Sequence, residues 1–488
     1  MRRTKQLVAA LALAVVATGS VGCEGGGEEP GLDEIGPPNI ILIVLDAASA
    51  AYFGAYGADG ESSPNIDRLA RESVVFENAY SQSATTVPST ASLLTGVRGT
   101  GHRMTGATVL PREYRTAPEI LAGYGYRAFG VIGNPFAGAP ALGFDRGYEE
   151  CVQVYAMREL QSLRATEKSN HFKVVLPEDI NRQVFRLLPG FGARGTFAYI
   201  HYLQPHKPYD PPVEYLRSPA LESAARPSWD DLHDAFVLAN ETGETSPSTI
   251  AEIEARYRAN LRFVDAGVGA LLERLERERW YDDSVIVLMG DHGDAFFKHA
   301  RFGHNVTLYD DMIRIPFLIK FPERDRIAPR RLPQLVETVD LLPTLFDYLE
   351  LPIPEQLEGD SLWPLIQGRA QRLEGPEVIV STVRLNQHAI RLGDHKYIRD
   401  VQGGEELYDL RADPDEQRNL IGEEPERARI LRERLESTVD VTGHREPGTA
   451  SDLRADPEMK RLLEILGYVG EEIPDAKPPP SHPPTPEP

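Results

Sequence analysis

The chain has 488 residues, 41% of them hydrophobic, and carries 52 basic and 74 acidic residues for a formal net charge of −22. This length permits one large α/β domain with a smaller one beside it. The acidic balance argues against nucleic acid as a partner, because neutralising phosphates needs a basic face, but it leaves room for one anionic group in a locally positive pocket.

Residues 1–22 have the pattern of a signal peptide. Basic residues precede an apolar run over 7–16, which is shorter than the roughly 20 residues that a membrane-spanning helix needs. The next residues, Gly22-Cys23, are similar to a bacterial lipobox. This predicts an exported protein, lipid-anchored through Cys23 to a bacterial membrane (periplasmic or cell surface), with ordinary secretion as the alternative. Residues 23–38, rich in Gly and Glu, are expected to form a flexible tether.

A series of apolar runs predicts the central sheet of a catalytic domain over residues 39–373. Continuous apolar runs suit parallel strands buried on both faces, and strands that alternate with helices indicate a mostly parallel sheet flanked by helices. The expected strands are 39–45, 127–132, 196–203, 284–289 and 315–321, and the expected helices start at Pro64 and span 249–280 and 336–349.

The pattern changes after residue 373. Short antiparallel strands are expected at 378–383, 388–398 and 406–410, followed by a helix near 425–438. We therefore expect a small C-terminal α+β subdomain over 374–470. The Pro-rich segment 471–488 is expected to be disordered.

Polar residues at the ends of these elements predict one pocket. Asp46 and the pair Asp291-His292 end two predicted parallel strands, at the edge where open α/β sheets bind ligands. Thr86 starts a predicted short helix, and a helix N-terminus favours anions. The sequence therefore predicts a cation held by Asp46, Thr86, Asp291 and His292, with an anionic group over the helix start.

Six segments resemble, in order and approximate spacing, the motifs of the sulfatase family, a branch of the alkaline-phosphatase superfamily. They are residues 38–46, 83–96, 201–209, 290–294, 308–316 and 406–410. The resemblance covers most of the chain from residue 38 onward. It implies an α/β fold of the sulfatase and alkaline-phosphatase type, and a metal-dependent hydrolase of sulfate or phosphate esters.

The nucleophile signature of this family is Cys or Ser-x-Pro-x-Arg, and two positions depart from it. Thr86 stands where the family has the Cys or Ser that becomes formylglycine, and Thr90 stands where it has Arg. Oxidising a threonine would give a ketone rather than an aldehyde. We therefore expect Thr86 to act as a plain hydroxyl nucleophile.

Other departures concern the metal and the anion. Ala47 replaces the second Asp of the family's first metal motif, and His292 replaces the usual Asn after Asp291. The Gly-Lys-Trp-His segment of true sulfatases corresponds to residues 132–136, which hold neither Lys nor His. A later active-site Lys is replaced by His304.

The set Asp46, Thr86, Asp291 and His292 is nearer to Thr-nucleophile relatives that work on phosphate esters, namely lipoteichoic-acid synthases, phosphoethanolamine transferases and nucleotide pyrophosphatases. Losing a carboxylate and gaining an imidazole favours zinc or manganese over calcium. We expect one divalent ion. A second ion at His206, Asp210 and His304 is an alternative, and His206 or His304 should protonate the leaving oxygen.

Three functions stay open at this point. The first is a metal-dependent hydrolase of sulfate or phosphate esters that uses Thr86 as nucleophile on phosphoesters. The second is a phosphotransferase that modifies an envelope lipid or glycan, and the third is a degenerate, non-catalytic anion-binding member. The expected partner is a small-molecule or glycan or lipid ester, with membrane contact only through the lipid anchor. As plain structural residues, Asp46 and Thr86 would be helix caps and His206 a loop histidine.

Overall fold

The computed structural model describes residues 36–104, 108–156, 175–192, 195–217, 229–304, 307–371, 378–383, 387–400 and 403–438. The signal peptide, Cys23, nearly all of the tether and the Pro-rich tail lie outside these residues, so the export pattern and the domain boundaries stay predictions. None of the helices in the described ranges combines the length and the apolar character that crossing a bilayer requires.

A nine-stranded mixed sheet forms the centre of the described residues. Its strand order is β11-β2-β10-β6-β1-β5-β3-β4, with β9 paired to β2. The strands are β1 (Asn39–Asp46), β2 (Val74–Tyr80), β3 (Arg127–Ile132), β4 (Glu150–Gln153), β5 (Thr196–Pro205), β6 (Ser284–Gly290), β9 (Arg314–Ile315), β10 (Phe317–Lys320) and β11 (Arg330–Glu337).

β1 occupies the middle of this sheet, parallel to β5 on one side and to β6 on the other. All eight of its residues are buried, as expected for an apolar strand that is covered on both faces. The carboxyl ends of β1, β5 and β6 therefore meet at one edge. The register shifts between Leu45 and Asp46, where β1 leaves the regular pairing.

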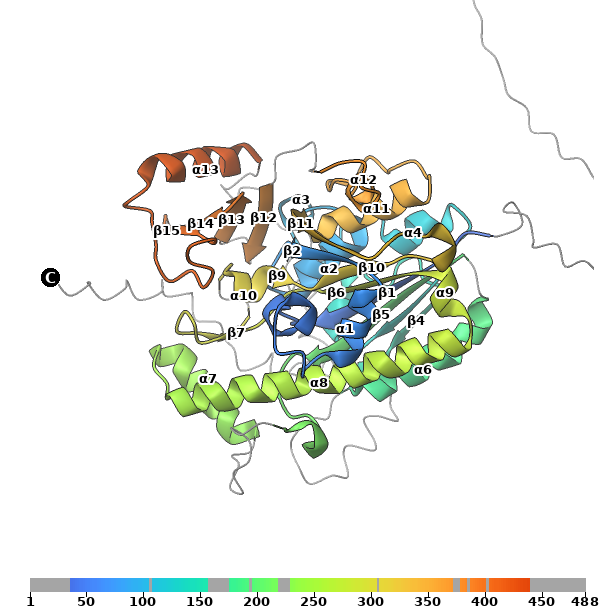
Figure 1. Ribbon diagram of the computed structural model, residues 1–488, viewed down its shortest axis with the longest axis horizontal. Coiled ribbons are helices and arrows are strands. Elements are labelled where there is room, and N and C mark those ends of the chain that lie inside the picture. Colours follow the sequence, from blue (N-terminus) through green and yellow to red (C-terminus); the bar gives the residue numbers. More distant parts are fainter. Residues whose placement is uncertain are drawn as a thin grey trace, which may run out of the picture. The chain divides into compact units, whose positions relative to one another are not determined.

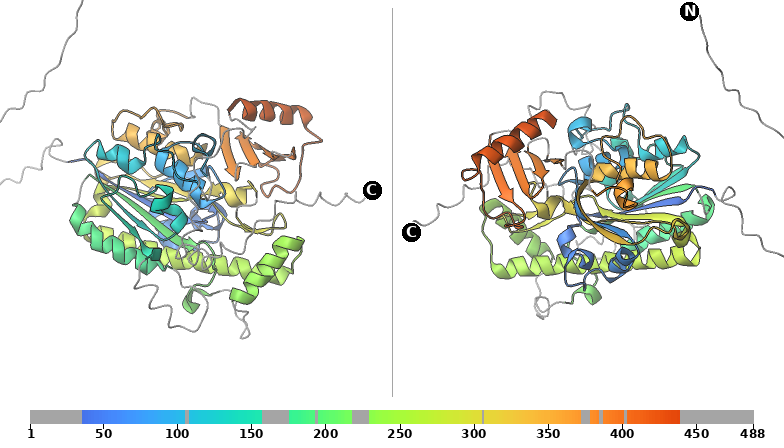
Figure 2. Two further views of the ribbon diagram at one scale, coloured as in Figure 1. Left: turned by 180° about the vertical axis from the view of Figure 1, so that it is seen from behind. Right: turned by 45° about the horizontal axis from the view of Figure 1, so that its top comes forward.

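Helices cover both faces of the sheet. α6 (Pro177–Phe191) and the long α8 (Pro247–Arg277) lie on one face, with α1 (Pro64–Arg71) beside α8. α2 (Thr86–Thr95), α4 (Ala117–Ala122) and α11 (Leu341–Tyr348) lie on the opposite face (Figures 1 and 2). The remaining helices are α3 (Gly99–His102), α7 (Trp229–Thr242), α9 (Trp280–Asp283), α10 (Asp310–Ile313) and α12 (Trp363–Ile366).

The sheet differs from the sequence expectation at its β10 edge. The run 315–321 was expected as a parallel strand, but β10 pairs antiparallel with both β6 and β2, which makes the sheet mixed. The helix expected over 336–349 is also wrong at its start: β11 continues to Glu337, and α11 begins at Leu341. Strands β2, β4 and β11 were not expected, because polar residues interrupt their apolar patterns.

A second sheet of four antiparallel strands follows, as expected for the C-terminal subdomain. It contains β12 (Val378–Val383), β13 (Gln387–Leu392), β14 (His395–Asp400) and β15 (Glu405–Asp409). The single strand expected over 388–398 is instead a hairpin, because the chain turns at Gly393 with φ +59°. Helix α13 (Pro425–Thr438) packs on this sheet through Leu431 and Leu435. A short hairpin of β7 (Ala295–Phe296) and β8 (Phe302–Gly303) lies after β6.

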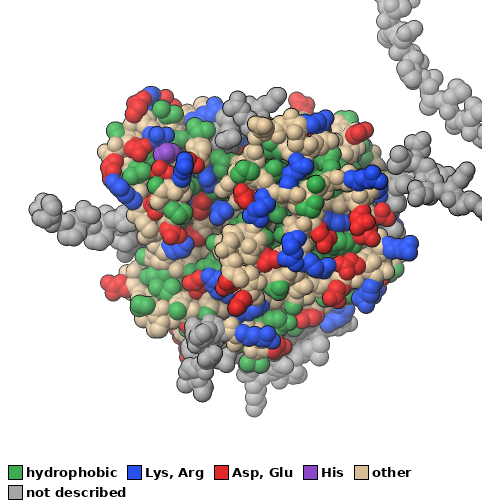
Figure 3. Space-filling view, viewed as in Figure 1, with side chains coloured by type: hydrophobic (Ala, Val, Ile, Leu, Met, Phe, Trp, Pro, Cys, Tyr) green, Lys and Arg blue, Asp and Glu red, His purple; other side chains and the backbone are tan. Residues whose placement is uncertain are grey.

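The surface mixes both signs of charge. Figure 3 shows acidic and basic side chains interspersed over the face that Figure 1 presents. Many of these charges pair at short range, for example Arg127 with Glu149 and Arg429 with Glu426. On this face the acidic side chains are therefore spread among basic ones and do not form one acidic patch.

Candidate active site

The two predicted carboxylates meet at the central edge of the sheet. Asp46 is the last residue of β1 and Asp291 directly follows β6, the neighbouring parallel strand. Both side chains are buried, with exposed fractions of 0% and 1%. Burial, and next the Asp291 carboxylate, raises the pKa of Asp46 well above its usual value.

One oxygen of each carboxylate is fixed by a protein donor. Asn134 Nδ2 donates to Asp46 Oδ2 at 2.5 Å, and the backbone N–H groups of Ala47 and His292 donate to Asp291 Oδ1 at 3.0 and 2.8 Å. The other two oxygens, Asp46 Oδ1 and Asp291 Oδ2, are buried without a hydrogen-bond partner in the described part of the chain. Buried, unpaired carboxylate oxygens are costly unless a cation is present.

The Nε2 atom of His292 lies near the two unpaired carboxylate oxygens of Asp46 and Asp291. Its Nδ1 lies 2.9 Å from the carbonyl oxygen of Gly293, which accepts the proton and leaves Nε2 as an acceptor. That Nε2 is 3.7 Å from Asp46 Oδ1 and 3.6 Å from Asp291 Oδ2. A tetrahedral ion with bonds of about 2.1 Å holds its ligand atoms roughly 3.4 Å apart. The donor set therefore fits one divalent ion.

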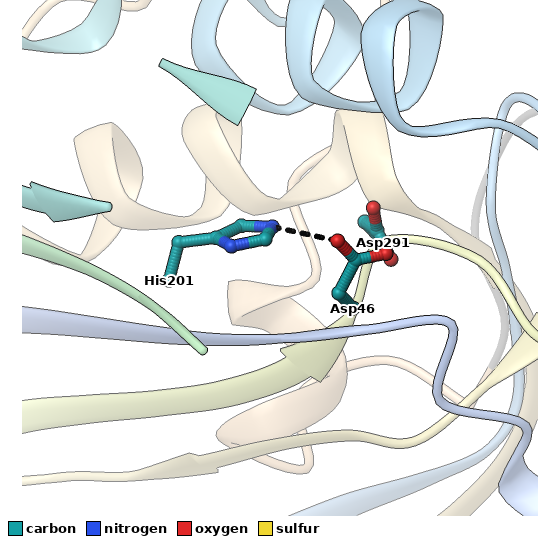
Figure 4. Close-up of side chains that lie close together, drawn as sticks. All are labelled: Asp46, His201 and Asp291. Carbon is teal, nitrogen blue, oxygen red and sulfur yellow. Dashed lines mark ion pairs between the residues drawn. The ribbon is translucent and has the colours of Figure 1, made fainter. Parts of the chain in front are cut away.

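His201 is a neighbour that sequence reasoning missed. One ligand atom each from Asp46, His201 and Asp291 lies within 4.8 Å of the others, and His201 Nε2 is 4.0 Å from Asp46 Oδ2. Figure 4 shows the His201 ring and the Asp46 carboxylate directed toward one another, with Asp291 behind. The available signal was an imidazole inside an otherwise apolar strand. Burial lowers the pKa of His201 to about 4.

The predicted nucleophile lies beside this cluster. Thr86 is the first residue of α2 and is buried, with its Oγ1 3.2 Å from His292 Nε2. The preceding Thr85 has extended backbone, as the residue before a helix does. Because α2 begins here, an anion that contacts Thr86 lies at the positive end of the helix.

His206 and His304 lie on the far side of His292. The ring centroids are 4.5 Å apart for His292 and His304 and 4.9 Å apart for His304 and His206. Burial, and next His304, lowers the pKa of His206 well below its usual value, and its Nδ1 lies 2.5 Å from the Lys207 carbonyl oxygen. His206 is therefore neutral at pH 7, with Nε2 as an acceptor rather than an acid.

His304 has the better environment for donating a proton. Its Nδ1 is 2.7 Å from Asp294 Oδ1, and Tyr209 donates its hydroxyl proton to the other oxygen of Asp294 at 2.5 Å. A carboxylate behind an imidazole orients the ring and stabilises its protonated form. Asp294 is fully buried and contacts His304 directly.

The second-ion alternative has no support in the geometry. Asp210 faces Arg256, with 3.6 Å between Oδ1 and Nη1, rather than His206 and His304. Across the described ranges, the group of three whose ligand atoms all lie within 4.8 Å of one another is Asp46, His201 and Asp291, and none of His206, Asp210 and His304 belongs to it. Asn134, which donates to Asp46, has no signal in the sequence, because the family motif at residues 132–136 is defined by Lys and His.

Comparison with known proteins gives the family that this chain resembles. The model of the sulfatase family matches residues 38–351, and a model described as the C-terminal part of N-sulphoglucosamine sulphohydrolase matches residues 298–441. An ulvan-active sulfatase of Formosa agariphila is 26% identical over 80% of this chain and 78% of its own. A Δ4,5-hexuronate-2-O-sulfatase of Bacteroides thetaiotaomicron is 25% identical over 90% of this chain and 96% of its own. The crystal structure of a phosphonate monoester hydrolase of Agrobacterium radiobacter superposes with a TM-score of 0.66 at 21% identity, covering 82% of this chain and 95% of that one.

Proposed function

Because this chain belongs to the sulfatase family, and is thus a hydrolase of sulfuric or phosphoric esters, we propose that it uses Thr86 as the nucleophile on phosphate esters. The observation that carries the proposal is a threonine hydroxyl in the family's nucleophile position, 3.2 Å from His292 and beside two buried carboxylates. A threonine hydroxyl is a poor nucleophile at its own pKa and needs such neighbours.

A bound divalent cation would neutralise Asp46 and Asp291 and lower the pKa of the Thr86 hydroxyl. Zinc or manganese is favoured over calcium, because the imidazole of His292 is a ligand that suits transition metals and not a hard cation. Metal analysis of the purified protein should find a transition metal in near-stoichiometric amount. Calcium alone, with full activity, would contradict the argument from His292.

The protein groups divide the reaction into two steps. Thr86 Oγ1 forms a bond to phosphorus while the bond to the leaving oxygen breaks, and His304, held by Asp294, gives that oxygen a proton. The hydroxyl proton of Thr86 passes to solvent before the attack. In the second step a water molecule gives a proton to His304 and attacks the phosphothreonine, which releases phosphate and leaves the Thr86 alkoxide to regain a proton from solvent. His206 is neutral and buried, and its ring lies 4.9 Å from that of His304.

The choice of phosphate over sulfate rests on the second step. A formylglycine hydrate can expel sulfate through its second hydroxyl, whereas a sulfothreonine has no such route. The relatives named above are sulfatases of glycans by name, so sulfate esters are the competing substrates. An acceptor alcohol in place of water would make the protein a phosphotransferase. The buried carboxylate oxygens support catalysis over simple anion binding, because a binding module has no need of them.

The test is turnover of matched aryl sulfates, aryl phosphates, aryl phosphodiesters and phosphonate monoesters by the purified protein. We expect a phosphate or phosphonate ester to be the best substrate, and rapid quenching to leave a phosphate on the peptide that contains Thr86. Turnover of aryl sulfates alone would refute the phosphoester proposal. Turnover of phosphoesters with no label on Thr86 would point to water as the nucleophile.

A further inference from the structure

His201 is an unusual histidine. It lies inside β5 with no exposed surface, and neither ring nitrogen has a hydrogen-bond partner in the described residues. Another buried imidazole, that of His102, shows the ordinary arrangement: its Nε2 contacts Ser92 Oγ at 2.9 Å and its Nδ1 accepts from the Met104 N–H at 3.0 Å. Buried polar atoms without partners are rare, and at a site they call for a ligand or an ion.

The position of His201 also matters. In the pairing of β1 with β5, His201 lies opposite Val44, two residues before Asp46. Its Nε2 is 4.0 Å from Asp46 Oδ2, and it belongs to the cluster whose ligand atoms lie within 4.8 Å. The side chain therefore enters the metal region from β5, whereas Asp46 enters from β1 and Asp291 from the end of β6.

Compared with the family motif, the metal site of this chain lacks one ligand unless His201 supplies it. Residue 47, where the family motif has a second aspartate, is a buried alanine with φ +57°. An alanine offers no side-chain donor, so β1 contributes one carboxylate instead of two. The remaining donors are Asp46, Asp291, His292 and the Thr86 hydroxyl, and the hydroxyl must stay available for the reaction.

We propose that His201 Nε2 is a ligand of the divalent ion, supplied from β5 in place of the carboxylate that Ala47 lacks. The inference rests on the metal site of the proposed function and goes beyond it by naming a ligand outside the recognised motifs. Two carboxylates and two neutral imidazoles would balance the charge of a divalent ion. Such a set suits zinc or manganese and offers calcium too few oxygens.

The experiment compares the metal binding of four forms of the full chain, namely the wild type, His201→Leu, His201→Glu and His102→Leu. Each is stripped with a chelator and titrated with zinc, and separately with cobalt(II), whose visible spectrum reports coordination. Thermal unfolding is measured with and without zinc. His102→Leu is the matched control, because it removes a buried imidazole whose two nitrogens already have protein partners.

We expect His201→Leu to weaken zinc binding by at least about 100-fold, since even residues that only support a ligand change affinity by roughly 10–100-fold. The same variant should lose the zinc-induced rise in melting temperature, while its metal-free melting temperature stays near that of the wild type. His201→Glu should still bind metal, with a changed cobalt spectrum and a gain in calcium affinity. His102→Leu should melt lower with and without zinc and keep the wild-type affinity.

Zinc binding by His201→Leu within about threefold of the wild type, with an unchanged cobalt spectrum, would overturn the proposal and leave the rest of the metal site intact. A wild-type protein that binds neither zinc nor manganese would overturn the metal site itself, and His201 with it. Should His201→Glu not fold, His201→Leu alone still decides between these outcomes.

Discussion

At the scale of single residues, the proposed mechanism depends on the hydroxyl of Thr86. Removing it with Thr86→Ala should abolish turnover while the fold is kept, because α2 retains its hydrophobic packing and loses only one polar atom. Thr86→Ser keeps the hydroxyl and should retain measurable activity. Steady-state kinetics with the best phosphoester, together with circular dichroism of both variants, checks this.

One result with Thr86→Ala would contradict the proposed role of Thr86. Turnover by Thr86→Ala at the wild-type rate would exclude the hydroxyl as nucleophile. The contact at 3.2 Å with His292 would then be structural, and the attacking group would be water.

Asp311, on α10, is a second residue with a measurable consequence. Both of its carboxylate oxygens are buried without a hydrogen-bond partner among the described atoms, and burial raises its pKa to about 7. An acid whose folded pKa is raised favours the protonated form, so folding loses stability as the pH rises from about 4 to about 7. Asp311→Asn should therefore stabilise the protein at pH 8 by roughly 4 kcal/mol and have little effect near pH 4.

Urea unfolding of Asp311→Asn and the wild type at pH 4.5, 6 and 8 measures this pH dependence. Asp415→Asn is the control, since Asp415 is exposed and pairs with Lys298. A stability difference for Asp311→Asn that is the same at all three pH values would mean that the carboxyl does not titrate in this range.

At the scale of elements, a buried charge cluster joins the two sheets. Lys396 on β14 is 1% exposed, and its Nζ lies 2.8 Å from Asp310 Oδ1 on α10 and 2.7 Å from Glu416 Oε1. Tyr80 on β2 donates to the other oxygen of Asp310 at 2.8 Å. The subdomain is thereby tied to α10, which follows the residues of the active site.

Removing the cation from this cluster takes away the ion-pair partner of the buried Glu416 carboxylate and the closest cation to the partly buried Asp310 carboxylate. Lys396→Met should lower the free energy of unfolding by about 3–5 kcal/mol. Lys298→Met, which breaks an exposed pair with Asp415, should cost less than about 1 kcal/mol. Chemical denaturation of both variants gives the comparison, and equal losses would show that burial does not set the cost.

Some of the strands could be predicted from the sequence alone and others could not. Strands β1, β3, β5 and β6 are continuous apolar runs, and such runs indicate buried strands without further information. β2 and β11 carry charged and polar residues at the sheet margin, so their patterns give no such signal. The antiparallel direction of β10 depends on which neighbours it pairs with, and no local pattern contains that.

The residues of the candidate site also fall into two groups, those that the sequence predicts and those that it does not. Asp46, Asp291 and His292 follow predicted strands, so their meeting at one edge could be foreseen. His201 could not be, because its role depends on the register of β5 against β1 and on the empty donor position at Ala47. Asn134 and the chain from Tyr209 through Asp294 to His304 are long-range contacts, which spacing along the sequence does not reveal.

At the scale of the whole molecule, the location of the protein in the cell depends on Cys23, which lies outside the described residues. We propose that the chain is exported and anchored through a lipid on this cysteine. Cys23→Ser should move the protein from the membrane fraction to the soluble exported fraction with its specific activity unchanged. Fractionation and mass spectrometry of the N-terminus test this, and membrane association that survives the substitution would rule out the lipid anchor.

The threonine at the start of α2 also changes what the cell must do to make this protein. A formylglycine residue exists only after a separate enzyme has oxidised the chain, so a host that lacks that enzyme produces a mixture or an inert product. Thr86 carries its hydroxyl from the moment of translation, and folding alone brings it beside His292. On the proposed mechanism, supply of the nucleophile is therefore independent of maturation machinery, and every folded copy carries the same group whichever host expresses it.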